Sequence, residues 1–329
     1  MSQPKPNLFV IGAMKSATTY FSQLLGAHPS IFVSVPKEPC FFSDPQILRE
    51  AYPEAWQRGF WRSLDDYLSL FVQAGDVQWI AEASTTYSMA PLFSGVPERI
   101  LALSPQARFI YIMRDPVERT ISHYWHRATY WGERRPMLQA IRNDRVYTDV
   151  SYYAMQLQTY LRHVARDRIY VLTYEALIAD PVRELQRAYS WLGVDPNVRP
   201  PKLDVPVNVT PDAIRVARGF GLLRNFATSA FYLKLFPWVP GLMRKLGSKL
   251  AFRHITPRDV PTAEVEAYLR PIQLRQAEEL AALLRRGFPE WTTLYGTART
   301  FELVRGQKEP AVLSEGELRV LTAQRMGRR

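Results

Sequence analysis

The residues best suited to bind a charged ligand lie near the start of the chain, in the stretch Asn7–Tyr20 with the sequence NLFVIGAMKSATTY. Its apolar part, Leu8–Ala13, is long enough for one buried strand and too short for a helix. Lys15 follows, and after it come the small and hydroxyl residues Ser16, Ala17, Thr18 and Thr19. These residues suit a tight turn and the start of a helix. Backbone N–H groups, the helix dipole and the lysine ammonium would then point at one anion, which predicts a phosphate-binding loop.

This loop differs from the common nucleotidase loop, G-x-x-x-x-G-K-[ST], which has a glycine directly before the lysine and a hydroxyl on Mg²⁺. Here Met14 precedes Lys15, and Gly12 is the nearest glycine before it. An ordinary strand–turn–helix unit with an incidental lysine would also explain the stretch. The interpretation therefore depends on the rest of the sequence.

A second cationic motif follows Arg108–Met113, the clearest strand pattern in the chain. It begins Arg114-Asp115-Pro116, and Ser122 comes eight residues after the arginine. We expect this serine to lie on a long helix that runs from about Val117 to Tyr130.

Two carboxylates also stand where predicted strands end. Lys37-Glu38-Pro39 follows the short strand Ile31–Ser34, and Glu82 ends the strand Trp79–Glu82. In a parallel sheet the carboxyl ends of the strands share one edge, where ligands bind. We therefore expect the lysine loop, the carboxylates and the arginine motif at one edge. Two anion subsites suit a ligand that is phosphorylated at two positions, unlike ATP, whose phosphates form one chain.

Strands alternate with helices along most of the chain, which indicates an α/β fold: a central parallel sheet of P-loop-like type, flanked by helices. The pattern also predicts helices at Pro97–Leu103, Tyr152–Arg166, Pro181–Leu192 and Thr262–Arg286, and a further strand at Arg168–Leu172. We expect one domain over residues 1–305, with a helical excursion after about Asp212, and a loosely ordered tail over residues 306–329.

The positive charge of the chain is concentrated in one segment. The net charge is +11, and between Ala213 and Arg258 there are nine Lys or Arg residues and no Asp or Glu. No nucleic-acid-binding module is recognisable, so an anionic small molecule, an anionic glycan or a lipid surface is the better partner. Seven aromatic residues accompany these charges. This composition fits either a cap over the active site, which we favour slightly, or an interfacial element that contacts membranes.

Three features bear on the compartment. Cys40 is the only cysteine, which excludes an intrachain disulfide. The apolar stretch near the N-terminus is short and interrupted by Lys15, unlike a signal peptide. No stretch has the length and composition of a transmembrane helix. We therefore expect a cytoplasmic location, either free or at the inner membrane surface.

The two cationic motifs together resemble those of the sulfotransferases that use 3′-phosphoadenosine 5′-phosphosulfate, particularly the bacterial and glycan-modifying branch. The resemblance covers roughly Asn7–Leu192. In that family a loop like KSATT holds the 5′-phosphosulfate, and R-D-P-x-x-R-x-x-S holds the 3′-phosphate. Arg114–Ser122, RDPVERTIS, matches the second motif at every fixed position, and a K-E-P-x-F-F element lies between the two motifs.

The resemblance implies a role for each residue of the site. Lys15 would stabilise charge on the leaving phosphate, and Ser16, Ala17, Thr18 and Thr19 would hold its other oxygens. Arg114 and Ser122 would bind the 3′-phosphate. Glu38 aligns with the general base that takes the proton of the acceptor. The acceptor would be a hydroxyl or amine of a carbohydrate, a lipid or a small metabolite, and no metal is required.

The sequence also departs from the family pattern. Glycan sulfotransferases often have E-K-[ST]-P after the third strand, whereas this chain has Glu82-Ala83-Ser84-Thr85 and so lacks that lysine. The later lysine–glycine nucleotide loop of the family is not evident near Asn208. A second cationic contact to the sulfuryl group and the adenine contacts are therefore not carried over to this chain.

Several residues have a second, structural interpretation. Glu38 could be a structural carboxylate paired with Lys37, and Arg114 could pair with Asp115 or Glu118. His123 and His126 are three residues apart on a helix, but no third ligand accompanies them, so packed or solvated histidines are favoured over a metal pair. Tyr153 and Gln156 could line the acceptor cleft or pack in the core.

Two other functions remain open at this stage. A P-loop-type nucleoside or metabolite kinase would need the missing glycine before Lys15 and an acidic metal ligand after a strand. A non-catalytic membrane-surface protein would keep the anion loop only as structure.

Overall fold

The computed structural model describes residues 3–200, 214–217 and 252–296. Its centre is a parallel sheet of five strands in the order β2-β3-β1-β4-β5. The strands are β1 (Leu8–Gly12), β2 (Ile31–Val33), β3 (Trp79–Ala83), β4 (Arg108–Met113) and β5 (Ile169–Thr173). Every predicted strand is present within two residues of its expected ends, and the predicted α/β class is confirmed.

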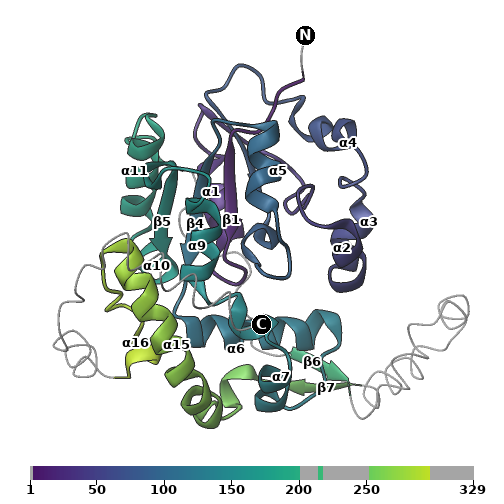
Figure 1. Cartoon of the computed structure of the whole chain (residues 1–329), viewed down its shortest axis with the longest axis vertical. Coiled ribbons are helices and arrows are strands. Elements are labelled where there is room, and N and C mark those ends of the chain that lie inside the picture. Colours follow the sequence, from purple (N-terminus) through teal and green to yellow (C-terminus); the bar gives the residue numbers. More distant parts are fainter. Residues whose placement is uncertain (1–2, 201–213, 218–251, 297–329) are drawn as a thin grey trace, which may run out of the picture.

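Helices surround this sheet (Figure 1). They are α1 (Thr18–Leu25), α2 (Pro45–Ala51), α3 (Pro53–Arg58), α4 (Leu64–Leu68), α5 (Val96–Leu103), α6 (Pro116–His126), α7 (Met137–Asn143), α8 (Val146–Asp149), α9 (Tyr153–Leu161), α10 (Tyr174–Ala179), α11 (Pro181–Leu192), α15 (Ala263–Leu284) and α16 (Thr292–Tyr295). Short 3₁₀ turns are η1 (Ser69–Phe71), η2 (Thr85–Ser88), η4 (Arg166–Arg168) and η6 (Pro257–Asp259), and η3 (Arg127–Trp131) is a π-helical turn.

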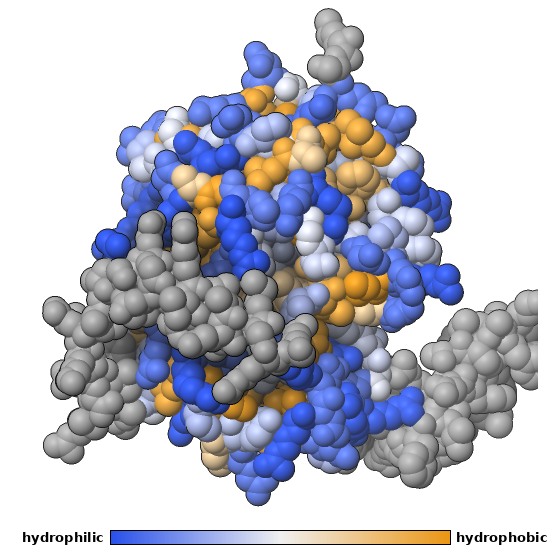
Figure 2. All heavy atoms as spheres, viewed as in Figure 1, coloured by the Kyte–Doolittle hydropathy of each residue, from blue (hydrophilic) through white to orange (hydrophobic). Residues whose placement is uncertain are grey.

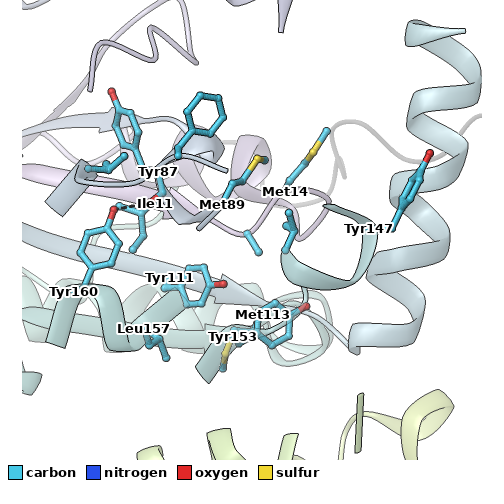
Figure 3. Packing of buried hydrophobic residues seen from close by; sticks show 14 of the residues in the cluster. Ile11, Met14, Tyr87, Met89, Tyr111, Met113, Tyr147, Tyr153, Leu157 and Tyr160 are labelled. Atoms are coloured by element: carbon cyan, nitrogen blue, oxygen red, sulfur yellow. Dashed lines mark hydrogen bonds between the residues drawn. The ribbon is translucent and has the colours of Figure 1, made fainter. Parts of the chain in front are cut away.

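The alternation of side chains along each strand separates two cores. Leu8 and Val10 of β1 pack with residues of α1 and α11 on one face of the sheet. Phe9 and Ile11 point to the other face, where they join a larger cluster with residues of α5 and α9. Figure 3 shows part of this second cluster, in which tyrosine rings and methionine side chains fill the space beside β1 and β4. Both faces of the sheet are therefore covered, as expected for parallel strands.

The chain reverses its direction of travel across the sheet at β1, because β2 and β3 lie on one side of it and β4 and β5 on the other. Ligands bind outside the carboxyl ends of strands at such a switch point. In Figure 1, α6, α7 and α15 lie at the end of the sheet toward which the arrow of β5 points. The loop after β1 and the motif after β4 meet this end.

Three parts differ from the sequence-based expectation. The helix expected over 117–130 ends as α6 at His126 and continues as the π-helical turn η3, which Gly132 closes with a left-handed φ of 75°. The helix α10 was not predicted. The excursion after Asp212 was expected to be helical, but it contains the antiparallel strands β6 (Ile214–Ala217) and β7 (Phe252–Ile255). Most of the basic aromatic segment 213–258 and the tail 306–329 lie outside the described residues.

Candidate active site

The loop after β1 is shaped by its backbone. Gly12 has a φ of +152°, and a Cβ atom there would lie 2.0 Å from Ser88 Oγ, so a side chain at this position would clash. Lys15 and Ala17 are left-handed, with φ values of 71° and 59°, which turns the chain sharply into α1. Ala17 is the N-cap and makes no side-chain hydrogen bond to the helix. The first N–H groups of α1 therefore have no capping side chain and can face an anion.

The side chains of this loop fit an anionic ligand. No described carboxylate lies within ion-pair distance of Lys15. Burial, followed by the charges of Arg114 and Arg119, lowers the pKa of Lys15 to about 8. Ser16 is fully buried, and its Oγ has no hydrogen-bond partner among the described residues. A bound phosphate group would supply the missing acceptor and the missing negative charge.

The motif after β4 already has partners for its charge. The Arg114 guanidinium lies 4.7 Å from the centre of the Tyr174 ring, and its Nη2 is 3.1 Å from Glu118 Oε2. The Tyr153 hydroxyl donates to the Arg114 carbonyl at 2.7 Å and so fixes the backbone. The alternative pairing of Arg114 with Glu118 is thus present, and the same arginine contributes to the field at Lys15.

Helix α6 connects the two cationic groups. Glu118, Ser122 and His126 follow Arg114 at intervals of four residues, which places them along one side of the helix. Ser122 is 7% exposed. Burial and the Lys15 charge lower the pKa of His126 to about 4, so this ring is neutral at pH 7 and lies near the lysine loop. Arg114 precedes α6, and Ser122 lies on the side of the helix that carries His126 toward Lys15.

Arg119 is the second fixed arginine of the motif and was given no separate role in the sequence-based interpretation. It is fully buried, and no described carboxylate lies within ion-pair distance of it. Its neutral partners are Ser151 Oγ at 2.5 Å, His123 Nδ1 at 3.3 Å, Thr120 Oγ1 at 3.4 Å and the Tyr147 carbonyl. Burial lowers its pKa to about 10, which leaves it charged at neutral pH. This uncompensated charge makes the surroundings of Lys15 more positive.

The two histidines of α6 have separate surroundings. His123 is fully buried against Arg119, and its pKa is well below the usual value because of burial. His126 packs on the rings of Tyr130 and Trp131, with centroids 4.9 and 5.0 Å away. Among the residues that the structure describes, no group of three His, Cys, Asp or Glu side chains could hold a metal ion.

Glu38 is fixed at the end of β3, the strand that neighbours β1. Its N–H donates to the Ala83 carbonyl at 2.9 Å, and its Oε2 accepts from the Thr85 N–H at 2.8 Å. Lys37 forms an ion pair with its other oxygen, and Arg58 Nη1 donates to the Lys37 carbonyl at 2.6 Å. The Glu38 side chain remains 25% exposed. It is therefore held rigidly on the ligand edge of the sheet, yet an acceptor can reach it.

Glu82 is a contrasting carboxylate. It has no exposed surface, and its oxygens accept hydrogen bonds from Ser84 Oγ at 2.6 Å and from the Tyr67 hydroxyl. Burial raises its pKa to about 7. Glu82 is enclosed in the core, and of the two carboxylates only Glu38 faces solvent.

Aromatic residues close to Glu38 and Lys15 were not predicted as site residues. The centre of the Tyr52 ring lies 5.1 Å from that of Trp131 and 5.6 Å from that of Phe93. The Trp131 ring in turn packs against His126. Tyr130 is 58% exposed beside them. Figure 2 shows hydrophobic side chains gathered on the surface near α2, on the side that faces α6. Tyr153 and Gln156, by contrast, are 2% and 1% exposed and belong to the core.

The site as a whole combines most of the predicted residues. Lys15, Ser16, Ala17, Thr18 and Thr19 form the loop and the first turn of α1. Arg114 precedes α6, Ser122 lies on α6, and Glu38 stands at the end of the neighbouring strand β3. Thr85, His126 and Arg119 were not predicted as site residues, although Arg119 is a fixed position of the second motif and His126 lies four residues after Ser122. The rings near Tyr52 lie far from the motifs in sequence and have no spacing pattern, so only their neighbours in space identify them.

Comparison with known proteins gives a consistent result. The model of the "Sulfotransferase family" matches residues 6–197. Mouse heparan sulfate glucosamine 3-O-sulfotransferase 3A1 is 26% identical over 206 residues, which are 59% of this chain and 47% of that protein. Bovine bifunctional heparan sulfate N-deacetylase/N-sulfotransferase 2 is 22% identical over 209 residues, which are 58% of this chain and 22% of that protein. The chain thus spans about half the length of the mouse relative and less than a quarter of the length of the bovine one.

A solved structure extends the likeness beyond the matched sequence. The sulfotransferase from Alicyclobacillus acidocaldarius superposes with a TM-score of 0.61 at 22% identity, over 88% of this chain and 99% of that one. At this identity the likeness shows a shared fold.

Proposed function

Because this chain belongs to the sulfotransferase family, we propose that it moves a sulfuryl group from 3′-phosphoadenosine 5′-phosphosulfate to a hydroxyl or amine. The acceptor would belong to a carbohydrate, a lipid or a small metabolite. The observation that carries the proposal is the pair of cationic groups at one sheet edge: Lys15, which has no carboxylate partner among the described residues, and Arg114, which directly precedes the helix that carries Ser122.

Each half of the donor has a matching group of residues. Lys15 and the loop residues Ser16, Ala17, Thr18 and Thr19 would hold the 5′-phosphosulfate, and the buried hydroxyl of Ser16 gains its missing partner there. Arg114 and Ser122 would hold the 3′-phosphate, the arginine through a charge-assisted hydrogen bond. Lys15 then stabilises the negative charge that builds up on the leaving phosphate.

Glu38 is the proposed general base. In the reaction a bond forms between the acceptor oxygen or nitrogen and sulfur, while the bond from sulfur to the 5′-phosphate oxygen breaks. A hydroxyl is too weak an acid to ionise first, so its proton leaves as the new bond forms. The Glu38 carboxylate can take that proton. Its contacts with Thr85 and Lys37 hold it in place but leave it partly exposed.

The acceptor is the least determined part of the proposal. The curated relatives named above act on heparan sulfate according to their names. Around Glu38 and Lys15 this chain places Tyr52, Trp131 and neutral His126. Such rings can pack against the apolar face of a sugar as well as against a lipid or an aromatic metabolite. All three acceptor classes therefore stay in the proposal.

The location of the enzyme is also a proposal. We expect it in the cytoplasm or at the inner membrane surface, where the basic aromatic segment 213–258 would serve as a cap or as a membrane contact. Most of that segment lies outside the described residues. Within the described part of the chain, no helix is long and apolar enough to cross a membrane.

A titration tests the proposed donor. Purified protein is titrated with adenosine 3′,5′-bisphosphate and, separately, with ATP and Mg²⁺. Tight binding of the bisphosphate with weak binding of ATP supports a sulfotransferase. The reverse order would favour the kinase alternative. Binding to anionic vesicles with no binding of either nucleotide would favour a membrane-surface protein without catalysis.

A further inference from the structure

Glu118 stands in the sequence midway between the two proposed ligands of the 3′-phosphate and is paired with one of them. It follows Arg114, which precedes α6, by four residues, and it shares one side of α6 with Ser122, four residues further on. Glu118 Oε2 is 3.1 Å from Arg114 Nη2, and its side chain is 42% exposed. The carboxylate thus neutralises the arginine that the ligand would need.

The other oxygen of Glu118 has a partner from the far end of the chain. Thr293 Oγ1, on α16, donates to Glu118 Oε1 at 3.0 Å. The next residue, Leu294, donates its N–H to Asp115 Oδ2 at 2.8 Å, and Arg270 Nε donates to the Thr293 carbonyl at 2.9 Å. These contacts hold α16 against the start of α6. Glu118 therefore has one partner for each oxygen, and only one of them is the arginine.

A phosphate group on Arg114 and Ser122 would lie beside a negative carboxylate. The phosphate and the carboxylate would repel each other because both are negatively charged. The Arg114 guanidinium also cannot donate its full set of hydrogen bonds to both anions at once. Because Thr293 holds the opposite oxygen, Glu118 can release Arg114 and keep one hydrogen bond. Replacing Glu118 by the phosphate at Arg114 costs little free energy, because a partly exposed ion pair between residues four apart contributes little stability.

We propose that Glu118 is a resident counter-ion of Arg114 that the 3′-phosphate displaces, and that Thr293 retains the displaced carboxylate. This inference rests on the proposed function. Glu118 is then a specificity-determining residue that lowers the affinity for every 3′-phosphorylated nucleotide. The spent donor still carries its 3′-phosphate, so the carboxylate also favours release of this product after transfer.

The first test replaces Glu118 by glutamine. The dissociation constant for adenosine 3′,5′-bisphosphate should fall about tenfold, and that for 5′-AMP should stay unchanged. The matched control is Glu184→Gln, which removes the acidic partner of Arg187 on α11. That control should leave both constants unchanged. Unchanged or weaker bisphosphate binding by Glu118→Gln would mean that Glu118 positions Arg114 and does not compete with the ligand.

The second test uses Thr293→Val. Without the hydroxyl, Glu118 keeps only Arg114 as a partner, so bisphosphate binding should weaken about threefold. In the Glu118→Gln background the same change should have no effect, because no carboxylate remains to be retained. An equal loss in both backgrounds would show that Thr293 merely braces α16 and would overturn the role given to it. Thermal unfolding of each variant identifies a folding defect, and Glu118→Ala serves as the carboxylate-free background if Glu118→Gln does not fold.

Failure of the inference about Glu118 can be distinguished from failure of the proposed sulfotransferase function. If the wild-type protein binds adenosine 3′,5′-bisphosphate no better than 5′-AMP and transfers no sulfuryl group, the proposed function fails. If the wild-type protein shows both properties and Glu118→Gln binds the bisphosphate no more tightly, only the inference about Glu118 fails.

Discussion

In the loop after β1, neither the Lys15 ammonium nor the buried Ser16 hydroxyl has a partner among the described residues, the first lacking a carboxylate and the second a hydrogen bond. After β4, by contrast, Arg114 is already paired with Glu118. The first group is shaped by the backbone, through Gly12 and the left-handed residues Lys15 and Ala17. The second is shaped by side chains from other elements, such as the hydroxyl of Tyr153.

This difference implies two ways of binding one ligand. Among the described residues, the Lys15 ammonium has no carboxylate partner and the Ser16 hydroxyl has no hydrogen-bond partner, so an anion there would replace no described contact of these two groups. The arginine motif must exchange an internal carboxylate for the phosphate. We therefore expect the loop to dominate the chemistry and the motif to dominate the choice of nucleotide.

The largest effect should come from a residue that belongs to neither group. Glu38→Gln should lower turnover by roughly 10²–10⁴-fold, because an amide cannot take the acceptor proton. Its affinity for adenosine 3′,5′-bisphosphate should equal that of the wild type. Single-turnover transfer, with bisphosphate binding measured in parallel, checks both points. Near-normal transfer would make Glu38 a structural partner of Lys37.

Removal of the loop cation should come next. Lys15→Ala should lower turnover by roughly 10²–10³-fold, the scale for one lost transition-state donor. Multiple-turnover rates at saturating donor measure the loss. Lys5→Ala, outside the loop, is the control and should retain the full rate. If Lys15→Ala affected only the affinity for the donor and not the rate, Lys15 would not stabilise the transition state.

The backbone origin of the loop can be tested by stability. Gly12→Ala combines a positive φ with a clash against Ser88 Oγ and should lower the free energy of unfolding by about 3 kcal/mol. Gly75→Ala is the control, because φ there is +64° but no atom lies within 4 Å of the new Cβ. It should cost about 1 kcal/mol. Equal losses in chemical denaturation would show that the packing around Gly12 is not specific.

The smallest expected effect is a pH dependence of binding. The pKa of Lys15 is about 8 without ligand, because burial and nearby arginines disfavour its charge. A bound phosphate raises that pKa, so binding above pH 8 requires uptake of a proton. The bisphosphate dissociation constant should therefore rise above pH 8, by at most about tenfold per pH unit. Lys15→Ala should show no such rise, and a rise of equal size in that variant would assign it to another group.

Much of the donor side could be predicted from the sequence because its parts are local. The apolar strand before Lys15 and the helical spacing after it fix the loop within a dozen residues. Likewise, Arg114 and Ser122 are only eight residues apart, at the end of one strand and on the helix that follows it. The parallel sheet then brings the two motifs to one edge, which explains why the alternation of strands and helices was sufficient.

The parts that were missed depend on contacts between distant segments. Thr85 holds Glu38 from 47 residues away, and Thr293 reaches Glu118 from 175 residues away. Neither contact leaves a pattern in the local sequence. The π-helical turn that places Trp131 beside Tyr52 was also missed, since periodicity alone does not distinguish it from the end of a regular helix.

The central claim is that the loop and the arginine motif hold two phosphates of one nucleotide. The most direct measurement is the affinity of wild type and Arg114→Ala for adenosine 3′,5′-bisphosphate and for 5′-AMP, with Arg134→Ala as an exposed arginine control. We predict that Arg114→Ala weakens bisphosphate binding by about 10–100-fold, the scale for a charged hydrogen-bonded contact, and leaves 5′-AMP binding nearly unchanged. An equal loss for both nucleotides would contradict the assignment of Arg114 to the 3′-phosphate and, with it, the two-subsite account.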